Sequence, residues 1–217
     1  MNAILAFGAM SSLELFISER ALYVRERANG YYYPSAYFVS KTVFDIIPLR
    51  VVPPILLGCI CYYMIGLRPE LEHFAKFLGL MVLFNFVSSS MCLAIGSVVP
   101  TVATANVIST LIILFFMLYG GFLLNLLTVQ WYLKWMQYSS YFYYAFEALV
   151  INELYNVDIL IDPEGLPPVQ GKGMFILQNL GMDPEHLSFD TMMMFVFSVL
   201  YISLAAFLLK FFVRERR

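Results

Sequence analysis

Hydrophobic residues form long blocks along this 217-residue chain, and polar residues gather in the short segments between the blocks. An apolar helix needs about 20 residues to cross the hydrocarbon core of a membrane, and the pattern predicts five such spans. They cover residues 1–17, 35–65, 74–98, 103–125 and 189–213. The first would rise only about 25 Å, less than the core thickness of about 30 Å. Either this helix is unusually short or the sequence begins partway through it.

The charges between the blocks predict an orientation. Basic residues follow the first span, at Arg20, Arg25 and Arg27, and they also close the chain at 210–217. The long segment 126–188 is acidic instead. Because Lys and Arg favour the cytoplasmic side, and five crossings place both basic regions on one side, we expect a cytoplasmic C terminus and an outer 126–188 segment.

The charged segment 18–30 is itself typical of a helix lying at the cytoplasmic membrane surface. Ser18 can cap its start and Gly30 can end it. Apolar residues recur at helical spacing at Ile17, Ala21, Val24 and Ala28. Such a stripe suits an interfacial anchor or a contact surface for a cytoplasmic partner, and the mixed charge signs are compatible with the second interpretation. Periodicity alone leaves both open.

The second span contains residues that are unusual in a membrane helix. Its prolines are Pro48, Pro53 and Pro54, and proline removes a backbone donor and favours kinks. Lys41 and Asp45 are spaced to share one helix face, and Arg50 lies deeper in the span. Ionisable groups in a membrane usually face protein or water, so we expect this face to point inward. A structural Lys41–Asp45 pair and a role in substrate binding are the two alternatives.

The fourth span ends in YGGFLLN, residues 119–125. Gly120 and Gly121 would allow neighbouring helices to approach closely. The bulky residues that follow suit either core packing or a gate. The next residues, 131–154, are rich in Trp and Tyr, which favour the membrane–water boundary, so we expect interfacial or re-entrant helices and then an exposed, turn-rich loop.

Composition narrows the class of protein. The chain is 61% hydrophobic and 13% charged, whereas soluble domains carry about 25% charged residues, so the sequence predicts an all-α integral membrane protein. A net charge of −2 without a basic tract argues against nucleic-acid binding. Of the lysines, only Lys41 precedes a Ser or Thr, and Ser35 and Ser40 replace the glycines of a phosphate-binding loop. Three scattered cysteines do not have metal-ligand spacing, and we expect no cofactor or catalytic residue in this chain.

Three segments in order, ISERALYVRERANGYYYPSAY, YGGFLLNL and WYLKWMQYSSYFYYAFEAL, resemble the membrane domain of G-subfamily ATP-binding-cassette (ABC) transporters, the White and breast cancer resistance protein type. The resemblance implies a partial ABC type-2 exporter transmembrane domain over residues 1–217. Residues 1–17 would end the second family helix, 18–30 would form the connecting helix, and 126–188 would hold re-entrant helices and an extracellular loop. The chain is then expected to be a fragment without its ATP-binding domain.

The resemblance also implies functional residues, and each group shares one role. Residues coupling the membrane to the ATPase domain would be Glu19, Arg20, Arg25 and Glu26. Residues lining the substrate cavity would be Phe7, Thr110, Leu114, Met117 and Arg50. Phe122 and Leu123 would form the plug between the inner and outer cavities, although Phe122 replaces the leucine of the family.

The implied function is ATP-driven export of a hydrophobic or amphipathic compound, such as a lipid, sterol or xenobiotic, by alternating access. The implied partners are the lipid bilayer, an ABC ATPase domain that binds ATP and magnesium, and a second half transporter in a homo- or heterodimer. The membrane would be the plasma membrane or an internal one. The alternatives are a separate permease subunit with a free-standing ATPase, and a structural or channel-like membrane protein. Segment 126–188 contains no cysteine and does not support a disulfide-linked dimer.

Overall fold

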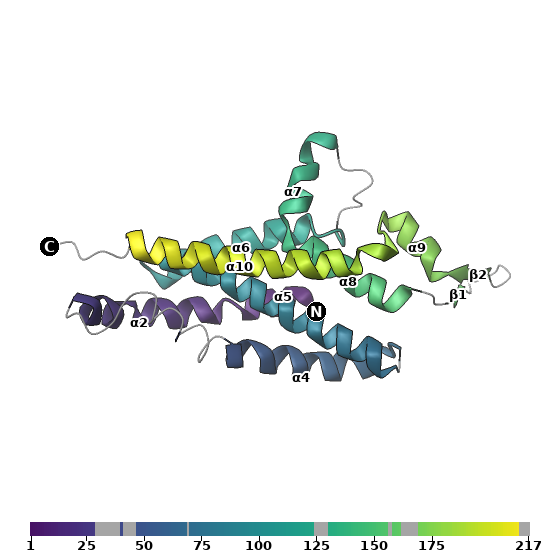
Figure 1. The fold of residues 1–217 in the computed structure, drawn as a ribbon, viewed down its shortest axis with the longest axis horizontal. Coiled ribbons are helices and arrows are strands. Elements are labelled where there is room, and N and C mark those ends of the chain that lie inside the picture. Colours follow the sequence, from purple (N-terminus) through teal and green to yellow (C-terminus); the bar gives the residue numbers. More distant parts are fainter. Residues whose placement is uncertain are drawn as a thin grey trace.

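The computed structural model describes residues 1–28, 40, 47–68, 70–123, 130–155, 158–161 and 169–212. This part of the chain is mainly helical, with one short β-hairpin, and the all-α membrane fold class expected from the sequence is confirmed (Figure 1). The first helices are α1 (Asn2–Gly8), α2 (Ser11–Ala28), α4 (Ile47–Ile65), α5 (Leu71–Val98) and α6 (Val102–Leu118). The later elements are η3 (Trp131–Leu133), α7 (Lys134–Ser139), α8 (Tyr141–Leu154), β1 (Asp158–Ile161), β2 (Val169–Lys172), α9 (Gly173–Leu180), η4 (Pro184–His186) and α10 (Leu187–Phe212).

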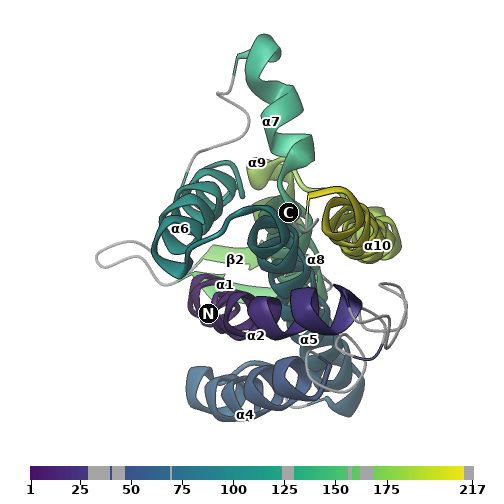
Figure 2. The same cartoon turned by 90° about the vertical axis from the view of Figure 1, so that its left-hand side faces the viewer.

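Helix α5 lies at the centre of the fold, and α1, α2, α4, α6, α8 and α10 all pack against it (Figure 2). It has 28 residues and rises about 42 Å, which is enough to cross a membrane. Small side chains in its middle let neighbouring helices approach. The hydroxyl of Ser88 bonds to that of Tyr141 on α8 at 3.3 Å, and the hydroxyl of Ser89 bonds to that of Ser12 on α2 at 3.3 Å.

The first helices differ from the prediction. Instead of one span over 1–17 and a separate helix over 18–30, the chain breaks at Ala9 and Met10 and then continues as α2 without interruption to Ala28. The hydroxyl of Ser11 bonds to the carbonyl of Gly8 at 2.9 Å, and that of Ser12 bonds to the carbonyl of Ala9 at 2.7 Å. Side chains that bond to nearby backbone carbonyls compete with regular helix bonds, which explains why the break lies here and not at the charged segment.

Close helix contacts depend on two glycines. A Cβ atom at Gly58 of α4 would lie 2.6 Å from Cδ2 of Leu78 on α5. A Cβ atom at Gly120, just after α6, would lie 2.9 Å from Cβ of Phe142 on α8. The close approach predicted at Gly120 is therefore confirmed. The helix itself ends at Leu118, earlier than the 103–125 span predicted, because the chain turns at Gly120 and Gly121 adopts a positive φ of 86°.

The sequence predicted interfacial or re-entrant helices over 131–154 and then an exposed, turn-rich loop. The described residues form the short helices η3, α7 and α8, and the strands of a β-hairpin follow where only a loop was expected. Strands β1 and β2 pair antiparallel, with Asp158 opposite Lys172 and Ile161 opposite Val169. The β-branched residues of this segment favour strand pairing. Figure 1 places the hairpin and α9 at one end of the molecule and the C-terminal ends of α2 and α10 at the other end.

Three described helical segments are long and apolar enough to cross a membrane: 48–65, 71–98 and 184–209. Helix α6 is apolar as well, but it is shorter, with 17 residues. The first predicted span, 1–17, is divided by the break before Ser11. Of the residues that the structure describes, three helices therefore meet the length criterion, against the five spans predicted from the whole sequence.

Candidate functional site

Helices α1, α2 and α6 form an apolar face that also carries polar groups. Phe7 on α1 and Leu114 on α6 are partly exposed there, and so are Val107, Ile108 and Leu111. The side-chain amide of Asn106 on α6 donates to Oε1 of the exposed Glu14 on α2 at 3.1 Å. A carboxylate that faces the hydrocarbon of a membrane is costly. The face therefore suits contact with protein or water better than contact with lipid.

Thr110 joins α6 to the break between α1 and α2. Its hydroxyl lies 3.8 Å from the sulfur of Met10, which is three residues after Phe7. This contact links α6 at Thr110 to the chain just after Phe7. Met117 lies two turns beyond Thr110 along α6, where it is partly buried and packs against the main core.

Met117 lines a second feature, a cavity of about 540 Å³ that also contains Phe122 and Leu123. The ring of Phe122 meets that of Phe146 on α8 edge to face, with centroids 5.8 Å apart. The first residues of the chain, Met1 to Ala3, form the opposite wall. Phe122 is 75% exposed and Leu123 is 51% exposed, so the two predicted plug residues are not held in the core of this chain.

Arg50 lies apart from these residues, in a cavity of about 760 Å³ between α1, α2 and α4. It is 6% exposed. Its Nη1 donates to the carbonyl of Gly8 at 2.9 Å, and its Nη2 donates to the hydroxyl of Ser11 at 2.8 Å. These acceptors flank the break between α1 and α2, where the amide of Ser12 bonds to Ala9 and leaves the Gly8 carbonyl available. The guanidinium therefore fixes the break, and its inward position agrees with the sequence prediction.

The backbone of Arg50 is tied to the neighbouring helix. Pro54 has no backbone N–H, so the carbonyl of Arg50 lacks its regular partner inside α4. The side-chain amide of Asn85 on α5 supplies a donor at 2.8 Å. Both ends of Arg50 are thus engaged, the side chain with α1 and α2 and the carbonyl with α5.

The coupling residues predicted from the resemblance all lie on α2. Glu19 and Glu26 are partly buried in the described part of that helix. The side chains of Arg20 and Arg25 lie outside the described residues, although their backbone is helical. Lys41 and Asp45 also lie outside the described residues, so their pairing stays a prediction.

Sequence reasoning missed the polar residues that organise this site. Glu14, Asn85 and Asn106 are not among the residues predicted from the sequence. A carboxylate or amide inside an apolar helix is itself a signal, because such groups are costly in lipid and usually find a partner. That rule would have selected all three.

Comparisons with known proteins agree on one family. The family model described as ABC-2 type transporter matches residues 1–154. The chain is 45% identical over 217 residues to ABC transporter G family member 24 of Dictyostelium discoideum, covering 100% of this chain and 19% of that protein. It is 34% identical over 212 residues to a probable ATP-dependent permease of Saccharomyces cerevisiae, covering 97% of this chain and 20% of that protein. It is 36% identical over 147 residues to the broad substrate specificity ATP-binding cassette transporter ABCG2 of Mus musculus, covering 68% of this chain and 22% of that protein. The chain thus spans about a fifth of the length of these relatives.

Proposed function

Because the chain belongs to the ABC-2 type transporter family, as a G-subfamily membrane domain, we propose that it forms the membrane-spanning part of an ATP-driven exporter of hydrophobic or amphipathic compounds. ATP and magnesium would bind to an ATPase domain outside these residues. The names of two relatives, a probable ATP-dependent permease and an ATP-binding cassette transporter of broad substrate specificity, support this proposal.

The observation that carries the proposal is the hydrogen bond between Asn106 and Glu14 at 3.1 Å on the apolar face of α1, α2 and α6. A path for amphipathic compounds needs apolar walls with a few polar groups, and this face has both. We propose that it encloses the substrate path together with the same face of a second half transporter. Phe7, Thr110 and Leu114 would contact the substrate there.

Alternating access requires that ATP binding favours one arrangement of the helices over another. The break between α1 and α2 supports this idea, because it separates the plug cavity from the charged end of α2. Because α2 is one continuous helix from Ser11 to Ala28, a movement of its end at Glu19 to Glu26 would also displace the break before Ser11. We propose that the cavity around Phe122 and Leu123 opens and closes in response.

The orientation follows the same proposal. The C-terminal ends of α2 and α10 lie at one end of the molecule, and the hairpin and α9 lie at the other (Figure 1). Arg20, Arg25 and Arg27 belong to the C-terminal half of α2, so we propose that the first end is cytoplasmic. A cysteine introduced in the β1–β2 connection should then react with an impermeant maleimide on intact cells.

The test uses the full-length protein reconstituted into proteoliposomes. ATP-dependent movement of a labelled sterol, a labelled phospholipid and rhodamine 123 would be measured for the wild type and for Glu14→Gln and Phe7→Ala. We expect both variants to have lower transport than the wild type. The control is Val199→Ala, which replaces an exposed residue of α10 and should leave transport unchanged. Unaltered transport of all three compounds by Glu14→Gln would contradict the proposed path.

A further inference from the structure

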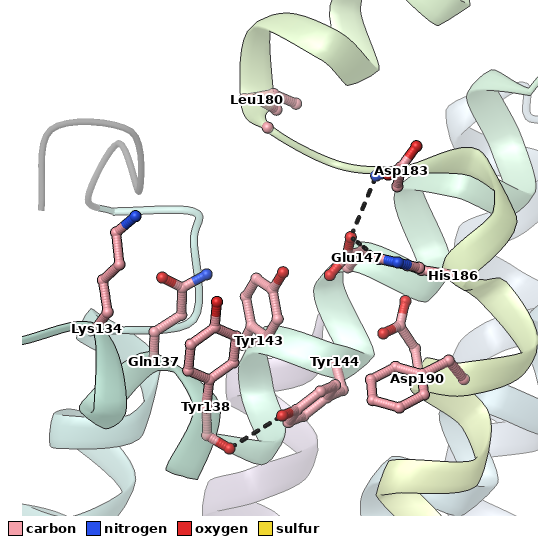
Figure 3. A pocket seen from close by; sticks show the side chains of 12 residues that line it. Lys134, Gln137, Tyr138, Tyr143, Tyr144, Glu147, Leu180, Asp183, His186 and Asp190 are labelled. Carbon is pink, nitrogen blue, oxygen red and sulfur yellow. Dashed lines mark hydrogen bonds and ion pairs between the residues drawn. The ribbon is translucent and has the colours of Figure 1, made fainter. Parts of the chain in front are cut away.

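A separate cavity of about 310 Å³ lies where α7, α8, η4 and α10 meet. It contains none of the residues assigned to the substrate path or the plug. Figure 3 shows aromatic rings along one side of it and two carboxylates on the other. The rings that line it are Tyr138, Tyr143, Tyr144 and Phe189.

The two carboxylates are deeply buried. Glu147 on α8 and Asp190 on α10 are each 1% exposed, and both line this cavity. Oε1 of Glu147 accepts a hydrogen bond from the backbone amide of Asp183 at 3.4 Å. Within the described residues, Oε2 of Glu147 and Oδ2 of Asp190 are buried and have no hydrogen-bond partner. Figure 3 shows the Asp190 carboxylate pointing toward Glu147.

Such an arrangement needs either a bound positive charge or a proton shared by the two carboxylates. A buried carboxylate that lacks partners costs several kcal/mol, and two carboxylates facing one space repel each other in addition. His186 reaches only Glu147, with Nδ1 at 3.7 Å from Oε1, and its side chain is 51% exposed. The ammonium group of Lys134 points away from both carboxylates in Figure 3. When protonated, His186 can pair with Glu147, but among the described residues no cation forms an ion pair with Asp190.

The composition of the cavity limits what can occupy it. Among the described residues, no three His, Cys, Asp or Glu side chains are arranged to hold a metal ion. Burial, with Glu147 beside the phenol, raises the pKa of Tyr143, and burial, with Asp190 nearby, raises the pKa of Tyr144 to about 12. Both rings therefore stay neutral at physiological pH and present electron-rich faces. Faces of this kind attract organic cations.

We propose that this cavity binds the ammonium group of a small organic cation, with Glu147 and Asp190 as counter-ions and the tyrosine rings as walls. The volume of about 310 Å³ is at the lower end for small-molecule sites and suits a single amine. The amine can belong to a free metabolite or to a lipid headgroup, since the recognised chemistry is the same. The proposal does not depend on the substrate path.

Its position gives the site a connection to the plug. Phe146 contacts Phe122, and the next residue, Glu147, lines the cation site. One helix, α8, thus carries both contacts on adjacent residues. Occupation of the site would hold α8 against η4 and α10 on the side away from the plug cavity.

The experiment measures binding to the full-length protein in nanodiscs, without ATP. The probes are radiolabelled choline and its uncharged carbon analogue 3,3-dimethyl-1-butanol, both followed by equilibrium dialysis. We expect choline to bind about tenfold more tightly than the alcohol, because only choline carries the charge. We expect Glu147→Gln and Asp190→Asn each to weaken choline binding about tenfold or more. Glu185→Gln, on an exposed residue of η4 outside the cavity, is the matched control and should bind as the wild type does.

Two lipid compositions separate the possible sources of the amine. Nanodiscs of phosphatidylglycerol offer no ammonium headgroup, whereas nanodiscs of phosphatidylcholine do. Weaker choline binding in phosphatidylcholine identifies a lipid headgroup as a competitor, and equal binding in both identifies a free amine. Either result supports the site.

Other results would overturn it. Equal binding of choline and the alcohol would mean an apolar pocket without charge recognition. Undiminished choline binding in both Glu147→Gln and Asp190→Asn would place the cation elsewhere. Absence of choline binding, together with a higher melting temperature of Glu147→Gln at neutral pH, would show that a shared proton neutralises the carboxylates. Because the two variants lie on different helices, failure of one to fold leaves the other as the test.

Discussion

The side-chain amide of Asn85 on α5 donates to the backbone carbonyl of Arg50 on α4 at 2.8 Å. That carbonyl is available because Pro54 has no N–H to offer it. The bond joins the central helix to the helix whose arginine fixes the break between α1 and α2. A proline in one helix and an amide in another therefore act as a pair.

The first prediction tests this pair. Asn85→Ala leaves the Arg50 carbonyl buried without a donor, which costs about 1–3 kcal/mol. We expect a lower melting temperature of the purified full-length protein in nanodiscs, measured by intrinsic fluorescence. Pro54→Ala restores a backbone N–H within α4, so the double variant should lose less stability than the sum of the single variants. Additive losses would show that Asn85 does not replace the missing helix bond.

The second prediction concerns the Arg50 side chain. Arg50→Met removes two charge-assisted hydrogen bonds to the break between α1 and α2, worth about 1.5–3 kcal/mol each. We expect the break to lose its fixed geometry, and spin labels at positions 4 and 56 should show a broader distance distribution by electron paramagnetic resonance. Arg50→Lys keeps the charge but not the fork of donors, so we expect an intermediate width. An unchanged distribution in Arg50→Met would contradict the role assigned to this residue.

A third prediction uses the glycine after α6. Gly120→Ala places a Cβ atom 2.9 Å from Cβ of Phe142, and overpacking of this kind costs about 1–3 kcal/mol. The matched control is Gly79→Ala in α5, where a Cβ atom would meet nothing within 4 Å and should add about 0.5–1 kcal/mol of stability. The two variants should therefore shift the melting temperature in opposite directions. A shift in the same direction for both would contradict the close approach of α6 and α8.

The fourth prediction tests whether Phe122 acts as a plug and not as a residue of the hydrophobic core. Phe122 is 75% exposed, so Phe122→Ala should change the melting temperature little. If the residue closes a path, the variant should increase passive leak of a small fluorescent amphiphile from proteoliposomes without ATP. Leu71→Ala, another highly exposed apolar residue, is the control and should leave the leak unchanged. Equal leak in Phe122→Ala and in the wild type would remove the plug from the mechanism.

Much of this fold follows from the sequence, since the long apolar blocks of α5 and α10 are read directly from hydropathy. The break before Ser11 does not follow from it, because no proline or glycine pair marks it and Arg50, which stabilises it, is 42 residues away from Gly8. Glu147 belongs to the acidic segment 126–188, which the sequence predicts to lie outside the membrane. Its burial depends on η4 and α10 packing against α8. Local patterns identify elements, whereas these features arise from contacts between distant segments.

The last prediction concerns the charged end of α2, where Glu19 and Glu26 are partly buried on the described helix. If this end receives the movement of an ATPase domain, Glu19→Arg in the full-length protein should lower ATP-dependent transport. Substrate binding measured without ATP should persist, because Glu19 lies on α2 beyond the break and is not among the residues assigned to the substrate path. Glu185→Arg, at the opposite end of the molecule, is the control for a reversed charge. A compensating charge reversal in the ATPase domain should restore transport, whereas a structural or channel-like protein would keep its function in Glu19→Arg without any compensation.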